Sequence, residues 1–213
     1  TPKCLLKVGN ITILERWIKA LELIGCESAI INTHYLHEQI EDFIKQNHKK
    51  WGIDIEIKYE KKLLGTAGTL LFNQKSFEDS TCLMLHTDNA TKVDLKPMIE
   101  VHNKREKKCL MTMLTFNSDQ PDRCGIVNIN NSKIVTSFEE KVKNPSGNIA
   151  NGAIYMFDND LINFLNDSKL ELYDFSLDVI PQLIGRIKTW HTEERFIDIG
   201  TLESYNLAQD IWI

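Results

Sequence analysis

At residues 83–90 the chain reads Leu83-Met84-Leu85-His86-Thr87-Asp88-Asn89-Ala90, a hydrophobic run that ends on an acid. A second run does the same at Arg195-Phe196-Ile197-Asp198-Ile199-Gly200-Thr201. Open α/β proteins bind ligands at the C-terminal edge of the sheet, and carboxylate oxygens suit Mg²⁺. The pair Asp88 and Asp198 therefore predicts a metal site for phosphate chemistry. For either acid alone, a cap on the turn after its strand is an equally good interpretation, because Asp is a favoured turn residue.

Length and composition indicate an ordinary globular protein. The 213 residues, 42% hydrophobic and 26% charged, are enough for one well-buried core, and we expect a single domain. The net charge of -5 argues against a broad nucleic-acid interface. No apolar run approaches the roughly 20 residues of a membrane span. From the charge and the lack of such a run, we expect neither a nucleic-acid nor a membrane partner. The five cysteines are odd in number and lack a C-x-x-C pattern, which indicates reduced thiols in a cytoplasmic protein.

Helices and strands alternate through the first half of the chain. Hydrophobic spacing predicts helices over 11–24, 36–47 and 95–104, and strands over 28–32, 53–57 and 82–85. Asn10 or Thr12 is available to cap the first helix, and Gly25 to end it. This alternation is typical of a parallel sheet covered by helices.

The second half is richer in strands that suit antiparallel pairing. We expect strands over 109–115, 153–157 and 186–189, and a hairpin of 125–129 with 134–138 that turns on Asn130-Asn131-Ser132. Short helices are predicted over 161–165, 177–184 and 205–212. The two halves together predict an α/β fold with a mixed, mostly parallel sheet flanked by helices.

Three short motifs carry candidate binding groups. Leu63-Leu64-Gly65-Thr66-Ala67-Gly68-Thr69-Leu70 enters a helix, and its glycines let backbone amides approach a base or ribose, although a tight connection is the more usual reason for such glycines. Phe138-Glu139-Glu140-Lys141 suits sugar hydroxyls and phosphate, or forms a solvated turn. Asn151-Gly152 offers an amide for hydroxyl recognition, or simply a turn.

Two other kinds of chemistry are disfavoured. His34 and His37 stand three residues apart without further Cys or His at suitable spacing, which indicates a polar helix start rather than a zinc site. His86 near Asp88 suggests general-base work, but the chain has no G-x-S-x-G elbow to support a hydrolase nucleophile.

The motifs follow one another along nearly the whole chain, in the order Pro2-Lys3-Cys4, Gly65-Thr66-Ala67-Gly68, Asp88, Glu140-Lys141, Asn151-Gly152 and Asp198-Ile199-Gly200-Thr201. This order resembles the sugar-1-phosphate nucleotidyltransferase family. The likeness is strongest to bacterial mannose-1-phosphate and heptose-1-phosphate guanylyltransferases and related uridylyltransferases, through Leu64–Gly68 and Ile31–Leu36.

The resemblance implies a Rossmann-like nucleotide-diphospho-sugar transferase fold. It also implies a single nucleotidyltransferase domain over 1–213, incomplete at its N-terminus because the family's G-x-G-T-R loop is absent from this chain. Site roles follow by position: Lys3, Asp88 and Lys141 act in catalysis, Asp88 and Asp198 bind Mg²⁺, Gly65, Thr66 and Gly68 face the nucleotide, and Glu140, Lys141, Asn151 and Gly152 hold the sugar phosphate.

The implied reaction transfers a nucleoside monophosphate from a nucleoside triphosphate to a sugar 1-phosphate and releases pyrophosphate. GTP is the favoured substrate, with UTP or CTP as alternatives, the expected product is of the GDP-mannose or GDP-heptose type, and a homo-oligomer is compatible with the family. Cys4, Thr87 and Val142 depart from the family pattern, which has Pro, Gly and Pro there.

Two competing hypotheses stay open at the level of sequence. A metal-dependent glycosyltransferase would share the sheet and the acids, but the D-x-D pair that marks such enzymes reads Asp88-Asn89-Ala90 here. A regulatory subunit that binds a nucleotide sugar without making one is the non-enzymatic alternative.

Overall fold

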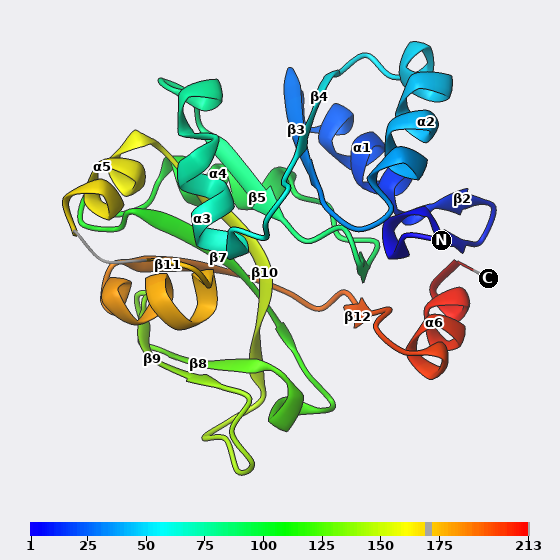
Figure 1. Ribbon diagram of the computed structural model, residues 1–213. Coiled ribbons are helices and arrows are strands. Elements are labelled where there is room, and N and C mark those ends of the chain that lie inside the picture. Colours follow the sequence, from blue (N-terminus) through cyan, green and yellow to red (C-terminus); the bar gives the residue numbers. More distant parts are fainter. Residues whose placement is uncertain (169–171, 213) are drawn as a thin grey trace. The chain divides into compact units, whose positions relative to one another are not determined.

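The computed structural model describes residues 1–168 and 172–212, which form two compact units (Figure 1). The first unit comprises residues 1–63, 87–95 and 195–213, and the second comprises 64–86 and 96–194. No helix among the described residues is long and apolar enough to cross a membrane.

The first unit is built around two helices and a short parallel pair of strands. Its elements are the 3-10 helix η1 (Lys3–Leu5), β1 (Lys7–Val8), β2 (Ile11–Thr12), α1 (Ile13–Leu23), β3 (Ser28–Thr33), α2 (His37–Asn47), η2 (His48–Lys50), β4 (Asp54–Tyr59), β6 (Asn89–Ala90), β12 (Ile197–Asp198), α6 (Leu202–Gln209) and η7 (Asp210–Trp212). Strand β3 pairs with β4 in parallel, and β1 with β2 in antiparallel orientation.

Helix α1 shows how the local sequence sets an element of this unit. The Thr12 side chain accepts a hydrogen bond from Glu15 N at 3.1 Å, and Gly25 ends the helix region with φ +77°. Leu14 and Ile18, four residues apart, are buried in a core that α2 joins through Ile40. Each such side chain stabilises the fold by roughly 1.5–3 kcal/mol through burial.

The second unit carries a mixed sheet. Its elements are α3 (Gly65–Phe72), η3 (Gln74–Phe77), β5 (Cys82–Leu85), α4 (Lys96–Asn103), β7 (Met111–Asn117), η4 (Pro121–Arg123), β8 (Gly125–Ile129), β9 (Val135–Glu140), β10 (Ile149–Phe157), α5 (Asn159–Asp167), the π-helical η5 (Phe175–Val179), η6 (Ile180–Leu183) and β11 (Ile187–Thr192). The strand order is β11-β7-β10-β8-β9, and β5 also pairs with β10.

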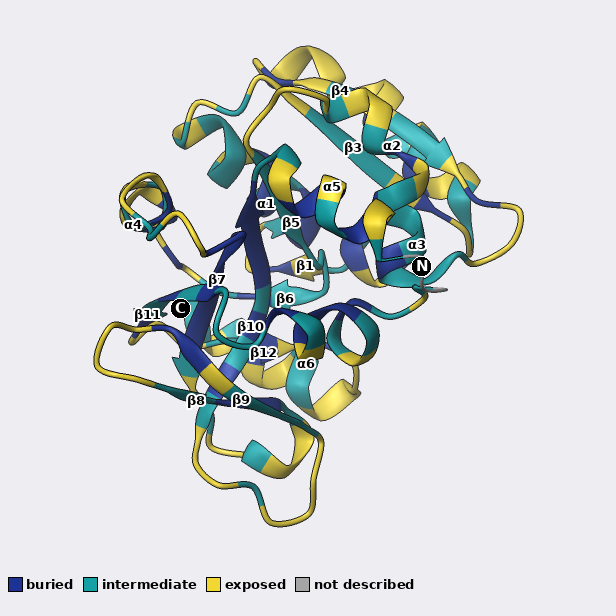
Figure 2. Ribbon diagram, turned by 90° about the vertical axis from the view of Figure 1, so that its left-hand side faces the viewer, coloured by how far each residue is buried: buried dark blue, intermediate teal, exposed yellow. Residues whose placement is uncertain are grey.

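Strand β10 is the centre of this sheet. It pairs with β7 on one edge, and with β5 and β8 on the other. Strands β7 and β10 are buried along most of their length (Figure 2), and their side chains Met113, Tyr155 and Phe157 are at most 1% exposed. The buried strands give the sheet a rigid frame on which surface groups are positioned.

The α/β class with a mixed sheet is confirmed, and most expected elements are present. The expected parallel majority is wrong for the described strands. Strands β11 and β7, and β3 and β4, run in parallel, whereas β10 pairs antiparallel with β5, β7 and β8, and β8 pairs antiparallel with β9. Among these antiparallel pairs, only β8 and β9 are joined directly by a short turn. The neighbours of β10 come from distant parts of the chain, and hydrophobic spacing does not indicate them.

Two helix predictions need correction. The segment 177–184 is not one helix but a π-helical turn followed by the 3-10 turn η6, because Pro181 lacks an N–H and cannot continue an α-helix. The last helix begins at Leu202 rather than at residue 205, because Thr201 and Ser204 form a capping box, and it ends in a 3-10 turn over Asp210–Trp212.

Candidate active site

The two aspartates that are remote in sequence lie on one short antiparallel ladder in the first unit. Strand β12 pairs with β6 so that Asp198 stands opposite Asn89, the residue after Asp88. Ile199 N donates to Asp88 O at 3.1 Å and extends the ladder by one pair. The structure therefore brings the backbones of Asp88 and Asp198 together across 110 residues of sequence, as expected for a shared cation.

Lys3 lies beside the first of these acids. Its Nζ is 3.7 Å from Asp88 Oδ2, and the two side chains are 54% and 33% exposed, so the ammonium is accessible to a ligand. The short helix η1 fixes this segment, because Leu5 N donates to Pro2 O and Leu6 N donates to Lys3 O, each at 3.0 Å. Burial raises the pKa of the neighbouring Cys4 thiol to about 11, which makes Cys4 a packing residue rather than a nucleophile.

Gly200 shapes the surroundings of the second acid. A Cβ atom built on Gly200 would lie 3.1 Å from Asp198 Oδ1, so a larger residue would crowd the carboxylate. Thr201 then caps α6 by accepting from Ser204 N at 3.1 Å. The Ile-Asp-Ile-Gly-Thr sequence thus places an exposed carboxylate at a sharp strand-to-helix connection.

Asp88 and Asp198 offer carboxylate oxygens, which are ligands of the kind that Mg²⁺ and Ca²⁺ prefer. Among residues 1–168 and 172–212, no cluster of three or more His, Cys, Asp and Glu side chains is arranged to hold a metal. Mg²⁺ is usually bound through one or two carboxylates, with water and phosphate oxygens filling the other positions. Two carboxylates are enough for such a site, and Mg²⁺ binding by Asp88 and Asp198 stays a prediction.

The glycine loop at the start of α3 is packed tightly against residues 173–175 in the second unit. Gly65 has φ +74°, and a Cβ there would lie 2.2 Å from Tyr173 O. Thr66 Oγ1 accepts from Phe175 N at 2.7 Å, and Ala67 N donates to Tyr173 O at 3.0 Å. A Cβ on Gly68 would contact the Leu64 side chain at 3.2 Å. These contacts give Gly65 and Thr66 a structural task, and their contact with a nucleotide stays a prediction.

Glu140 and Lys141 end β9 on a sharp change of backbone direction. Lys141 has φ +49°, a conformation rare for a residue with a side chain, and its N–H donates to Cys124 O at 3.0 Å. Lys141 Nζ is 3.6 Å from Glu140 Oε1. Burial raises the pKa of Glu140, and Lys141 opposes that rise. Strain at this position is typical of residues held in place for function.

Gly125 makes room for Glu140 and was not identified from the sequence. It pairs with Glu140 across β8 and β9, and a Cβ on Gly125 would lie 2.6 Å from Glu140 Oε2. The only signal in the sequence was a glycine at the start of a predicted hairpin strand, which is too common to single out.

Asn151 and Gly152 lie on a bulge of β10. The register of β10 against β7 shifts between Asn151 and Tyr155, and Ala153 has φ +52°. Asn151 Oδ1 accepts from Ala153 N at 3.0 Å, and Asn151 Nδ2 donates to Tyr155 Oη at 2.7 Å. Burial raises the pKa of Tyr155, which keeps its hydroxyl protonated. Gly152 is buried, and the left-handed conformation falls on Ala153 instead.

Residues 173–176 connect the motifs of the second unit and were missed in the sequence. Tyr173 and Phe175 contact the glycine loop, Ser176 hydrogen-bonds Tyr155, and the charge of Asp174 adds to burial in raising the pKa of Glu140. The available signal was Asp174 itself, whose Oδ1 accepts from Leu177 N at 2.9 Å as a helix cap.

Comparisons with known proteins identify the family of this chain and two of its relatives. The sequence model of the family described as "Nucleotidyl transferase" matches residues 1–211. The D-glycero-alpha-D-manno-heptose 1-phosphate guanylyltransferase of Campylobacter jejuni is 30% identical over 96% of this chain and 87% of its own length. The enzyme of the same description from Aneurinibacillus thermoaerophilus is 27% identical over 98% of this chain and 88% of its length.

A solved structure shows the same fold. The crystal structure of HddC from Yersinia pseudotuberculosis complexed with GMP-PN superposes with a TM-score of 0.82, at 25% identity over 100% of this chain and 91% of that chain. The resemblance inferred from the motif order is confirmed, and this chain belongs to the nucleotidyl transferase family, among the sugar-1-phosphate nucleotidyltransferases.

Proposed function

We propose that this protein transfers GMP from GTP to a heptose or mannose 1-phosphate, releasing pyrophosphate and forming a GDP-sugar. The guanylyltransferases among its relatives support this choice of base and sugar. The observation that carries the proposal is the β6–β12 ladder, which joins Asp88 and Asp198 beside the Lys3 ammonium.

The residues of the first unit supply charge compensation. Asp88 and Asp198 would hold Mg²⁺, which when bound neutralises phosphate charge and orients the triphosphate. Lys3 contributes an exposed ammonium, a common phosphate ligand. Lys3 also offsets the charge of Asp88 before substrate arrives, since the two groups form an exposed ion pair.

The bond changes need no side-chain nucleophile. An oxygen of the sugar 1-phosphate, already anionic at neutral pH, forms a new bond to the α-phosphorus of GTP. The bond from that phosphorus to the bridging oxygen breaks, and pyrophosphate leaves with the bonding electrons. The remaining barrier comes from bringing two polyanions together, which positioning and positive charge overcome.

The residues of the second unit are suited to the sugar phosphate. Glu140 is a partly buried carboxylate that accepts hydrogen bonds from sugar hydroxyls, and Lys141 places an exposed ammonium beside it for the phosphate. Asn151 is half-buried and is oriented by Ala153 and Tyr155, and we infer that Asn151 and the neighbouring Gly152 contact the sugar. We further infer that Gly65, Thr66 and Gly68 lie along the nucleotide.

A substrate panel tests this function directly. The complete protein is incubated with each of the four ribonucleoside triphosphates and a set of sugar 1-phosphates in Mg²⁺, and pyrophosphate is measured. We expect release with GTP and a manno-configured sugar 1-phosphate. Release only with UTP or CTP would show that the proposed base is wrong. No release with any combination of nucleotide and sugar 1-phosphate would contradict the proposed function.

A further inference from the structure

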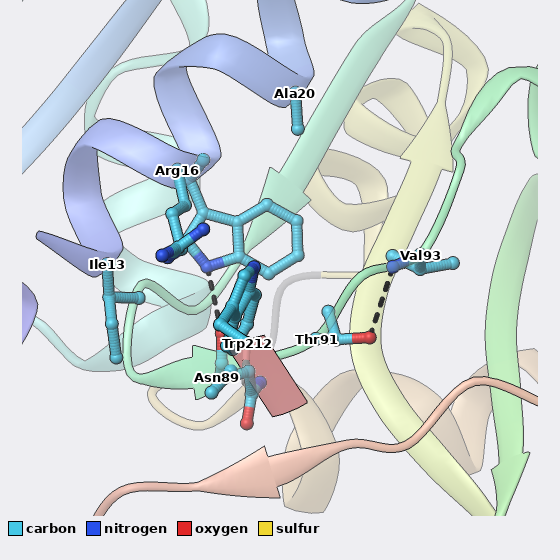
Figure 3. Close-up of a pocket in the computed structure, with 9 residues that line it drawn as sticks. Ile13, Arg16, Ala20, Asn89, Thr91, Val93 and Trp212 are labelled. Carbon is cyan, nitrogen blue, oxygen red and sulfur yellow. Dashed lines mark hydrogen bonds between the residues drawn. The ribbon is translucent and has the colours of Figure 1, made fainter. Parts of the chain in front are cut away.

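The strand that follows Asp88 is held by a residue of helix α1. Trp17 Nε1 donates to Asn89 O at 3.1 Å, a contact across 72 residues of sequence (Figure 3). Asn89 comes directly after Asp88 and stands opposite Asp198. The bond is therefore made where the two acids meet.

The geometry of the ladder explains why Asn89 needs a donor from elsewhere. Ile199 N donates to Asp88 O, so these two residues form a hydrogen-bonded pair. Bonded and non-bonded pairs alternate in an antiparallel ladder, which makes Asn89 and Asp198 a non-bonded pair. The Asn89 carbonyl therefore faces away from β12, and the Trp17 indole supplies its donor.

Trp17 is itself fixed by its surroundings. Its side chain is buried, at 5% exposure. The preceding residue, Arg16, donates from Nε to Val8 O at 3.0 Å, and its guanidinium lies 4.1 Å from the centre of the Trp212 ring. The cavity beside these groups has a volume of about 30 Å³, too small for an organic ligand. The buried Trp17 ring therefore lies in a packed cluster with little free space around it.

Helix α1 also connects to the segment that carries Lys3. Ile13 N, at the start of α1, donates to Leu6 O at 3.1 Å, directly after η1. One rigid helix thus joins the Lys3 segment at its start and strand β6 through Trp17. We propose that Trp17 is a positioning residue that sets Asp88 and Asp198 for the divalent cation; this inference rests on the proposed function.

Replacement of Trp17 by Phe tests the role, because it keeps a ring and removes the N–H. Trp51→Phe is the matched control, since Trp51 is also buried in the first unit and its Nε1 has no hydrogen-bond partner among the described residues. Mn²⁺ binding is measured by electron paramagnetic resonance without nucleotide, for wild type, both variants and Asp88→Asn.

We expect Trp17→Phe to bind Mn²⁺ about tenfold more weakly than Trp51→Phe, the scale of losing a group that orients a metal ligand. The Mg²⁺ concentration for half-maximal activity should rise similarly, while kcat at saturating Mg²⁺ stays within a few-fold. If Trp17 had a purely structural role, Trp17→Phe would lower the melting temperature without weakening metal binding relative to Trp51→Phe.

Two negative results are distinguishable. Equal Mn²⁺ affinity for Trp17→Phe and Trp51→Phe, with Asp88→Asn weaker than both, overturns the positioning role and leaves the metal site standing. Equal affinity for wild type and Asp88→Asn overturns the proposed metal site itself. If Trp17→Phe does not fold, benzothienylalanine placed at position 17 removes the N–H at unchanged ring size and answers the same question.

Discussion

Single carboxylates carry the proposed chemistry, so single-atom changes test it. Asp88→Asn and Asp198→Asn each keep side-chain size and remove a negative charge. We expect either variant to lower kcat for pyrophosphate release by a factor of about 10² or more, the scale of losing one transition-state electrostatic contact. Asp54→Asn, an exposed aspartate of β4 in the same unit, is the control and should stay near wild type. Near-normal turnover of either site variant would remove its role.

Glu140 offers a second test at the residue scale. Glu140→Gln keeps the shape but replaces a charged acceptor, which is worth about 1.5–3 kcal/mol in a hydrogen bond. We predict that KM for the sugar 1-phosphate rises about tenfold or more, while KM for GTP is unchanged.

The neighbouring Glu139→Gln is a close control for this change, because the Glu139 carboxylate accepts from Ser146 N rather than lying beside Lys141. Equal effects of the two substitutions on sugar binding would argue against a specific role for Glu140.

The residues that carry the proposed chemistry were the most predictable part of the site. The residues that hold them in position were the least predictable part. The strand-end position of Asp88 and Asp198 was visible because a hydrophobic run stops at an acid. Trp17, Gly125 and Asp174 were not visible, because their tasks depend on contacts with residues 15 to 72 positions away. In the sequence, Trp17 is one residue of a hydrophobic helix face, Gly125 is a glycine in a hairpin and Asp174 is a helix cap. All three features are common, and only the fold shows which residues they contact.

At the scale of elements, we expect the start of α3 to require glycine at position 65. Gly65→Ala meets two penalties, a left-handed backbone at φ +74° and a Cβ 2.2 Å from Tyr173 O. Gly25→Ala meets only the first, with φ +77° and open space around it. We predict a loss of about 1–2 kcal/mol in the free energy of unfolding for Gly25→Ala, from the left-handed penalty alone.

For Gly65→Ala we predict a clearly larger loss, measured by urea unfolding at constant pH, because backbone atoms must move. Gly147→Ala, where a Cβ meets nothing within 4 Å and φ is not left-handed, should be nearly neutral. Equal losses at positions 25 and 65 would show that the close approach of Tyr173 does not constrain the loop.

Helices and strands were predicted well where the hydrophobic pattern repeats over many residues. They were predicted poorly where a single proline or the pairing of strands determines the structure. The predicted hairpin of β8 and β9 is confirmed by their antiparallel pairing. Asn130 stabilises its turn, because the Asn130 side chain accepts hydrogen bonds from Ser132 N and Ile134 N. The helical segment over 177–184 failed at Pro181, and strand direction failed because alternation of hydrophobic residues does not reveal the neighbour of a strand.

At the scale of the whole molecule, one buried histidine couples stability to pH. His102 on α4 is fully buried, with Nδ1 2.9 Å from Thr112 Oγ1, and burial, aided by Arg105, lowers its pKa to about 4. The unfolded chain takes up a proton on this histidine near pH 6.5 and the folded chain does not. Stability is therefore fully present above about pH 6.5 and falls as the pH drops towards 4.

We expect this histidine to cost the wild type up to about 3 kcal/mol between pH 7 and pH 4. His102→Gln, which cannot titrate, should lose less stability over the same range, as measured by urea unfolding at several pH values. Parallel pH profiles for the two proteins would show that His102 is not the group responsible.

In the proposed active site, Asp88 and Asp198 share one divalent cation. The most direct measurement is a crystal structure of the complete protein with Mn²⁺ and a non-hydrolysable GTP analogue, with the metal located by its anomalous scattering. We predict one metal peak contacted by carboxylate oxygens of both aspartates and by phosphate. A metal bound to phosphate alone, or to only one of the two acids, would contradict it.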